Sequence, residues 1–151
     1  MQFWTHLSAG IFAALVLFSF VHNPFLFGLI VVVSSLLPDI DSPTSKLGRN
    51  NFSKTLTAFF KHRGVIHSVF FMLLVYFFLL MFWHFAALPF LVGYSVHLLL
   101  DLLTPRGLRL FWPFKFRIKG FVRSGGLLEI FVFVIFLILD CALISIHLLG
   151  L

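Results

Sequence analysis

The 23 residues from Leu127 to Leu149 are LLEIFVFVIFLILDCALISIHLL, and this stretch decides the class of fold. Glu129 and Asp140 are the only acidic residues in it, and it contains no Lys or Arg. A helix needs about 20 predominantly apolar residues to cross the hydrocarbon core of a bilayer. The stretch therefore predicts a membrane-spanning helix.

The rest of the chain has the same character. It has 151 residues, of which 61% are hydrophobic and 11% charged, whereas a soluble domain carries about 25% charged residues. A length of this size supports one domain, so we expect residues 1–151 to form a single integral membrane domain. The lone Cys141 excludes a disulfide framework. The first apolar run lacks the features of a signal peptide and is expected to stay as a helix.

Five apolar runs predict an all-α, polytopic membrane bundle of about five helices. The runs are Phe3–Val21, Phe25–Leu37, Val65–Phe85, Leu88–Leu103 and Leu127–Leu149. The first, third and fifth are long enough to cross a bilayer, whereas the second and fourth are short. Turns are expected at His22-Asn23-Pro24 and at Ala86–Pro89.

The basic residues are confined to two longer loops. All 11 Lys and Arg residues lie in Pro38–Gly64 and Thr104–Gly126. With five helices, both loops and the N-terminus fall on one side, which the positive-inside rule makes cytoplasmic. We therefore expect a multi-pass protein of the cytoplasmic (inner) membrane, and the net charge of +6 requires no nucleic acid partner.

Both loops have patterns typical of segments that lie against a membrane. The first has apolar residues at helical spacing, which predicts an interfacial amphipathic helix: Phe52, Leu56, Phe59 and Phe60. In the second, apolar and basic residues alternate from Phe114 to Lys119, which predicts an extended, half-buried segment whose cations face lipid phosphates. Simple positive-inside anchoring explains both patterns equally well. Membrane lipids are the expected partners.

Ionisable and polar side chains gather at the helix ends on this same face. They are His6, Asp39, Asp41, His62, Arg63, His67, His97, Asp101, Thr104 and Glu129. Such groups are costly within a membrane and are usually functional, paired or both. Each one alone is more typical of an interfacial hydrogen bond or a turn. Their convergence from separate helices favours a metal site.

The spacing of these residues indicates how they would act. His97 and Asp101 are four residues apart on one helix face, which suits a shared metal ion or a carboxylate–imidazole hydrogen bond. Asp39 and Asp41 follow Pro38 and are two apart, so one would bind metal while the other orients a ligand.

The HRGVIH segment leaves its roles open. His62 and His67 are five residues apart and need not share a helix face, which allows one to ligate metal while the other contacts substrate. Arg63 would grip a phosphate or simply anchor the loop. Asp140 lies apart from the cluster, and a buried hydrogen bond or helix contact is expected there, with His22, His84 and His147 as the nearest candidate partners.

Several strings together resemble one known family. They are THLSAG, LLPDIDSPTSKLGR, HRGVIHS, GYSVHLLLDLLTPRGLRLFWPF and GGLLE, which run from His6 to about Glu129. They resemble the YdjM-like, LexA-regulated inner-membrane metal-dependent hydrolases, although Ile66 stands where that family often has Thr. The HxxxD pair of His97 and Asp101 is also distantly similar to the zinc-dependent phospholipase C and single-strand nuclease superfamily.

The resemblance implies metal-dependent hydrolysis of a phosphoester lipid or lipid-linked phosphate. It implies a divalent metal, zinc in one or two ions, with manganese or magnesium as alternatives. Gly125 stands where the superfamily has a His before Glu129, which argues against three ions. The expected ligands are His6, Asp39, Asp41, His67, His97 and Asp101. The expected catalytic residues are His62 or Glu129 as acid or base and Arg63 for phosphate charge.

Two other classes of function remain open at this stage. A non-catalytic metal-binding protein, either a transporter or a structural partner subunit, would use the same ligands. Transporters place polar groups near the bilayer midplane, whereas these gather at one face. A nucleic-acid enzyme would also use basic loops, but the interleaved apolar residues favour lipid.

The predicted topology can be tested by labelling single cysteines introduced into a Cys141→Ser background. Positions Ser45 and Ser124 should react from the cytoplasmic side, and Asn23 from the opposite side. Labelling of positions 23 and 45 from the same side would contradict the topology.

Overall fold

The computed structural model describes residues 1–41, 65–114 and 116–150. The predicted amphipathic stripe from Phe52 to Phe60 lies outside the described residues. So do His62, Arg63 and the side chain of Asp41.

The described residues form five α-helices, which confirms the predicted all-α class. They are α1 (Phe3–Leu17), α2 (Pro24–Leu36), α4 (Val69–Phe82), α5 (His84–Leu102) and α6 (Leu127–Leu149). Two short 3-10 helices, η1 (Phe18–Phe20) and η2 (Leu37–Asp41), follow α1 and α2. Extended pairing within the described ranges is limited to one antiparallel bridge between Leu108 and Ile118.

Among the described residues, three helical segments are long and apolar enough to cross a membrane: Phe3–Phe20, His84–Leu102 and Leu127–Leu149. The prediction that the third apolar run would be the long one, and the fourth short, was wrong. The third run forms the 14-residue α4, whereas the fourth forms the 19-residue α5. The expected turn at Ala86–Pro89 lies inside α5, and the chain breaks one residue before that helix, at Trp83.

Pro89 can lie inside α5 because it stands close to the start of the helix. The first four N–H groups of any helix have no partner within it, so a proline at the sixth position removes only one backbone hydrogen bond. The sequence rule that proline ends a helix therefore placed the break several residues too late.

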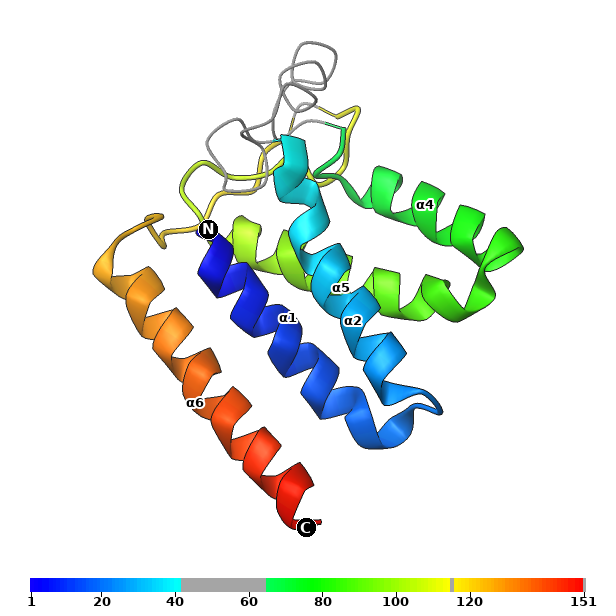
Figure 1. Ribbon diagram of the computed structural model, residues 1–151. Coiled ribbons are helices and arrows are strands. Elements are labelled where there is room, and N and C mark those ends of the chain that lie inside the picture. Colours follow the sequence, from blue (N-terminus) through cyan, green and yellow to red (C-terminus); the bar gives the residue numbers. More distant parts are fainter. Residues whose placement is uncertain (42–64, 115, 151) are drawn as a thin grey trace.

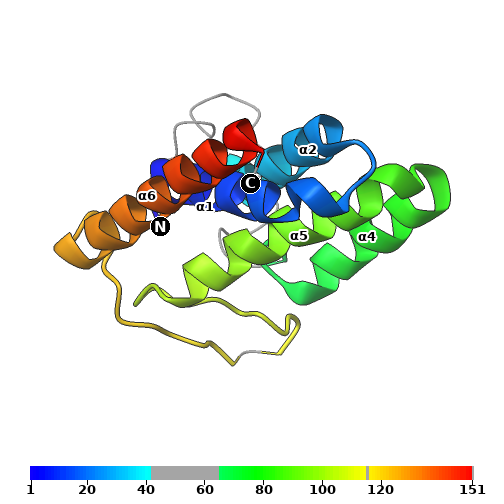
Figure 2. The ribbon, with the colours of Figure 1, turned by 90° about the horizontal axis from the view of Figure 1, so that it is seen from below.

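The helices form two layers. In Figure 1, α1 lies between α6 and α2. The view from below in Figure 2 shows these three helices in one layer, with α5 and α4 in the second. The layers meet where α5 packs against both α1 and α2. This meeting point positions the polar cluster described below.

Glycines let α2 approach its two neighbours very closely. A Cβ atom at Gly93 of α5 would lie 2.1 Å from the backbone oxygen of Val31. A Cβ atom at Gly10 of α1 would lie 2.4 Å from Ser35 Oγ. Small residues at such contacts are the usual means of close helix packing in membranes. Gly10 and Gly93 each stand one turn from a histidine of the cluster, His6 and His97.

A buried hydrogen bond also connects α1 to α6. Ser8 Oγ donates to Asp140 Oδ2 at 2.8 Å, and both residues are buried. The expectation of a buried interhelical hydrogen bond for Asp140 is therefore confirmed, but the partner is a serine and not His22, His84 or His147. Further along the same helix pair, the His147 ring contacts the carbonyl of Leu15 at 3.0 Å.

The segment between α5 and α6 is held by its backbone. Leu108 and Ile118 exchange two N–H···O bonds of 3.0 Å, and Val122 N–H donates to the carbonyl of Leu103 at 2.8 Å. The prediction of an extended segment is confirmed around Ile118. The prediction that it is half-buried was wrong for Phe114 and Phe116, which are 71% and 68% exposed. Apolar residues that this protein leaves uncovered suit contact with lipid.

The close approach at Gly93 yields a stability prediction. Gly93→Ala places a methyl group against the Val31 carbonyl, which cannot move without shifting α2. We expect a loss of about 2 kcal/mol or more of unfolding free energy, as for other overpacked sites, measured by thermal unfolding in detergent. Gly28→Ala is the matched control, because its Cβ would meet only Ala14 at 3.5 Å. This control should be neutral or stabilising, since alanine favours helix. Equal melting temperatures for the two variants would contradict the packing argument.

Candidate metal centre

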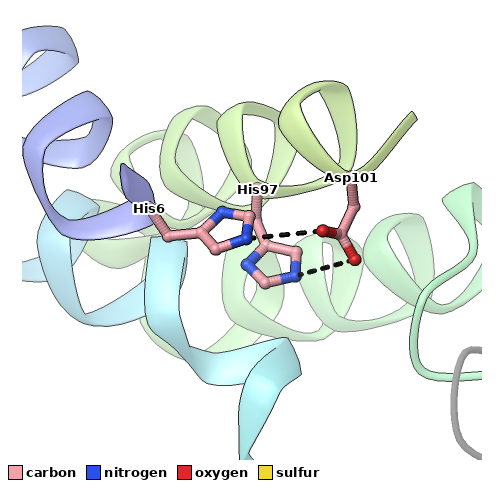
Figure 3. A group of neighbouring side chains, drawn as sticks. All are labelled: His6, His97 and Asp101. Carbon is pink, nitrogen blue, oxygen red and sulfur yellow. Dashed lines mark ion pairs between the residues drawn. The ribbon is translucent and has the colours of Figure 1, made fainter. Parts of the chain in front are cut away.

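His97 lies at the centre of a buried polar cluster where α1, α2 and α5 meet (Figure 3). Its Nδ1 is 2.7 Å from the backbone carbonyl of Ser35. A carbonyl can only accept, so Nδ1 carries the proton and Nε2 presents a lone pair. That Nε2 has no hydrogen-bond partner among the described residues. A histidine fixed in this way has the tautomer and orientation of a metal ligand.

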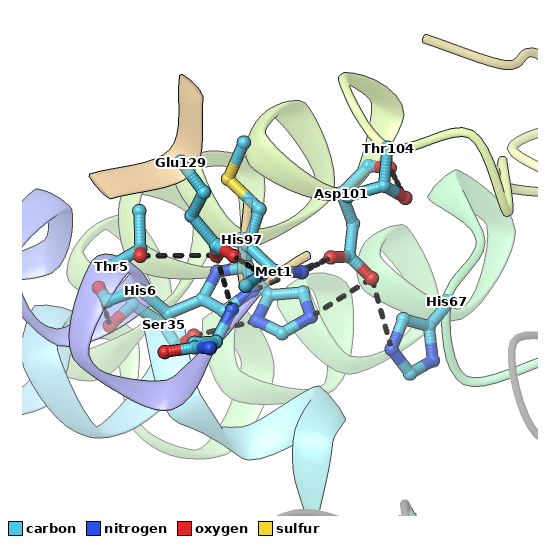
Figure 4. A network of polar contacts seen from close by, with 11 residues as sticks. Met1, Thr5, His6, Ser35, His67, His97, Asp101, Thr104 and Glu129 are labelled. Atoms are coloured by element: carbon cyan, nitrogen blue, oxygen red, sulfur yellow. Dashed lines mark hydrogen bonds and ion pairs between the residues drawn. The ribbon is translucent and has the colours of Figure 1, made fainter. Parts of the chain in front are cut away.

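Asp101 presents its two carboxylate oxygens to different neighbours. Its Oδ2 lies 4.0 Å from His67 Nε2 and 4.0 Å from His97 Nε2. Its Oδ1 lies 3.4 Å from His6 Nε2 and also contacts the amino group of Met1. The carboxylate therefore faces three imidazoles and one amine, all buried (Figure 4).

His67 comes from a turn and not from a helix. The helix α4 begins at Val69, with Ser68 as its N-cap, whose Oγ accepts from Phe71 N–H at 3.2 Å. Tyr94 of α5 donates its hydroxyl to the carbonyl of Ile66. The turn is thus fixed on both sides of the imidazole, which is fully buried.

His6 packs face to face with His97. The two ring centroids are 4.0 Å apart with 14° between the planes. Ser35 Oγ lies 3.4 Å from the carbonyl of His6, so the same residue of α2 contacts both histidines. The Nδ1 of the fully buried His6 has no hydrogen-bond partner in the described ranges.

Two groups of side chains have ligand atoms within 4.8 Å of one another. One is His6, His97 and Asp101, and the other is Asp39, His67 and His97. His97 belongs to both groups, so the two groups adjoin at this residue. Asp101 faces His6 through Oδ1, and His67 and His97 through Oδ2.

The spacing in the cluster is close to what a tetrahedral ion needs. With metal–nitrogen bonds of about 2.0–2.1 Å, two ligands of a tetrahedron lie about 3.3 Å apart. The distances from Asp101 Oδ2 to His67 Nε2 and to His97 Nε2 are 4.0 Å each, which exceeds this by less than 1 Å. Asp39 groups with His67 and His97, whereas Asp101 groups with His6 and His97, so side-chain movement is needed to bring all of them to one ion.

Glu129 lies beside the cluster, and its carboxylate is held by hydrogen bonds. Its Oε1 accepts from the backbone N–H of Gln2 at 2.5 Å and from Thr5 Oγ1 at 3.2 Å. Its Oε2 accepts from the backbone N–H of Gly125 at 2.5 Å. The carboxylate thus ties the start of α6 to the start of α1. It positions both helices beside the cluster, whatever its part in proton transfer.

The structure brings most of the sequence-predicted site residues together. His6, Asp39, His67, His97 and Asp101 converge, and Glu129 borders them. Thr104 stays at the end of α5, where its Oγ1 donates to the carbonyl of Asp101 at 2.8 Å. Sequence reasoning missed Ser35 and Thr5. The SS pair at the end of an apolar helix gave only a weak signal for Ser35.

The amino-acid sequence is similar to those of known inner membrane proteins. A sequence model described as "YdjM inner membrane protein" matches residues 1–149. "Inner membrane protein YdjM" of Escherichia coli is 39% identical over 113 residues, which cover 67% of this chain and 58% of that protein. "Uncharacterized protein YvsG" of Bacillus subtilis is 30% identical over 139 residues, covering 83% of this chain and 82% of that protein. No solved structure matches the chain.

The contacts of Glu129 predict a structural effect of its substitution. Glu129→Gln replaces one acceptor oxygen with an NH₂ group that would face a donor. We expect a loss of about 1.5–3 kcal/mol, the range for hydrogen bonds to a charged group. Thr5→Val removes only the 3.2 Å bond and should cost an amount at the lower end of this range, about 1.5 kcal/mol. Thermal unfolding in detergent measures both. An unfolding free energy of Glu129→Gln at or above that of Thr5→Val would contradict the tethering role.

Proposed function

Because the chain belongs to the YdjM inner membrane protein family, we propose that it is a membrane-embedded, metal-dependent hydrolase. Its substrate is a phosphoester lipid or lipid-linked phosphate, cleaved at the cytoplasmic face of the membrane. The protein crosses the membrane several times, with its N-terminus on the cytoplasmic side. The choice of a phosphoester draws on the resemblance to the zinc-dependent phospholipase C superfamily.

One observation carries the proposal. Nε2 of His97 is buried, is fixed as an acceptor by the Ser35 carbonyl, and lies 4.0 Å from Asp101 Oδ2, and the His67 ring centroid lies 5.3 Å from the centroid of the His97 ring. A buried polar atom without a hydrogen bond costs about 1–3 kcal/mol. A cation would satisfy this atom, as it would Nε2 of His6, which lies 3.4 Å from Asp101 Oδ1.

The donor set fits zinc better than a harder ion. Imidazole suits zinc and other first-row metals, whereas magnesium favours oxygen ligands and keeps several waters. His67, His97, Asp39 and Asp101 would hold the first ion. His6 and Oδ1 of Asp101 would serve a second ion or stabilise the first. A zinc ion bound there supplies a water of lowered pKa and polarises a phosphoryl oxygen.

The remaining roles belong to side chains of this chain. Asp101 balances positive charge in the cluster, and Ser35 holds the reactive tautomer of His97. Glu129 or His62 would move protons between water and the leaving group, and Arg63 would stabilise phosphate charge. The three hydrogen bonds that Glu129 accepts favour His62 for the proton transfer.

Asp101→Asn tests the centre. The change keeps the size of the side chain but removes the negative charge that balances a divalent ion. We expect bound zinc to fall from stoichiometric to well below one per chain, with hydrolysis of a panel of phospholipids and lipid phosphates falling in parallel. Asp140→Asn is the matched control, because it changes a buried carboxylate that lies on α6 and contacts Ser8. This variant should retain its zinc.

Two outcomes would contradict the proposal. One is wild-type protein, purified without chelators, that holds no zinc and takes none up. The other is stoichiometric zinc with no hydrolysis of any member of the panel, which would favour a non-catalytic metal-binding membrane protein.

A further inference from the structure

A groove lies beside the cluster, in the layer of α1. It has a volume of about 400 Å³ and is lined by Ala9, Ala13 and Val16 of α1, Val96 and Leu100 of α5, and Phe136 of α6, among other apolar residues. Helix α1 packs against both α5 and α6 and forms its floor. In Figure 2, α6 lies on one side of α1 and α5 on the other.

The groove begins where the cluster ends. Ala9 follows His6 by three residues on α1, and Val96 and Leu100 are the chain neighbours of His97 and Asp101. On α6, Phe136 stands two turns beyond Glu129. On α1 and α6 the groove residues lie further along the helix than the polar residue, whereas on α5 they lie at the level of His97 and Asp101. The groove therefore adjoins the cluster through chain neighbours, and His6, His97 and Asp101 themselves lie behind its wall.

We propose that this groove holds an acyl chain of a lipid whose anionic head group lies at the His and Asp cluster. The inference rests on the proposed function for the head-group end and names how the lipid substrate is recognised. The lipid comes from the leaflet that contains the cluster.

The length of the groove fits one leaflet. Val16 lies ten residues after His6, which is about 15 Å along an α-helix. The hydrocarbon core of a bilayer is about 30 Å thick, so one leaflet contributes about 15 Å. The three helices that line the groove are also the three that are long enough to cross a membrane. The occupant at this depth must therefore be apolar.

The width of the groove favours a hydrocarbon chain over a helix. A 15 Å length of helix about 10 Å in diameter occupies roughly 1,200 Å³. The groove offers about 400 Å³, which lies within the usual range for small-ligand sites. A second copy of this chain could therefore cover the groove but not enter it.

The charge at the head-group end fits an anion. Beyond Asp101, a second cavity of about 250 Å³ is lined by Pro105, Arg106, Arg123 and Ser124. The backbone hydrogen bond between Val122 and Leu103 holds the second of these arginines near the end of α5. Two arginines beside a cluster of potential metal ligands complement a lipid phosphate.

The test uses phosphatidic acid with a photoreactive diazirine midway along one acyl chain. The purified full-length chain is reconstituted with this probe in phosphatidylcholine nanodiscs, irradiated, and mapped by mass spectrometry. Cross-links should concentrate on groove residues such as Val16 and Leu99. Val16→Trp should reduce them at least five-fold by filling the groove. Val134→Trp is the matched control, because Val134 is 40% exposed, Val16 is 43% exposed, and only Val16 lines the groove.

Each result supports or overturns the inference. Cross-links spread evenly over the lipid-facing surface of α4, or unaffected by Val16→Trp, would overturn it. Equal groove labelling by a diacylglycerol probe would overturn the claim that the phosphate directs the chain into the groove. Zinc binding is measured on the same samples. Groove labelling without zinc leaves this inference standing and removes the proposed function, whereas zinc-dependent hydrolysis without groove labelling does the reverse.

Discussion

The hydrogen bond between His97 Nδ1 and the carbonyl of Ser35 is the contact on which the cluster depends. It requires α2 to lie very close to both α1 and α5, and Gly10 and Gly93 remove the Cβ atoms that would prevent this. With α2 in this position, the backbone carbonyl of Ser35 fixes the tautomer of His97. The Ser35 hydroxyl then lies 3.4 Å from the carbonyl of His6, so one residue of α2 contacts both α1 and α5.

The same contact explains why so many polar groups can be buried in so apolar a chain. Ionisable groups at membrane depth are stable when they face the interior of the bundle and interact with one another. Asp101, three histidines and an amino group meet there, while the outer faces carry residues such as Phe77 and Leu137 that remain exposed on the protein. Glu129 and Asp140 add further buried polar contacts between α1 and α6. The apolar groove lies beside these contacts and is lined by α1, α5 and α6.

Much of this arrangement could be predicted from the sequence, for physical reasons. The length and apolar character of Leu127–Leu149 required a membrane helix, and the i, i+4 spacing of His97 and Asp101 required a shared face. Helix boundaries were harder, because Pro89 interrupts the pattern without ending α5. The partner of Asp140 was missed because it is Ser8. A serine carries neither a charge nor an imidazole, so the positions of those groups in the sequence do not point to it. The role of Ser35 depends on a backbone carbonyl, and no side-chain pattern encodes which carbonyl will meet a histidine.

The central claim is that these side chains form one metal centre. The most direct measurement is a crystal structure of the zinc-loaded protein with anomalous difference density collected at the zinc edge. The account predicts a peak about 2.0–2.2 Å from Nε2 of both His67 and His97 and from a carboxylate oxygen of Asp101. Zinc density only at His22, His84 or His147, with His97 Nε2 still distant from any ion, would contradict it.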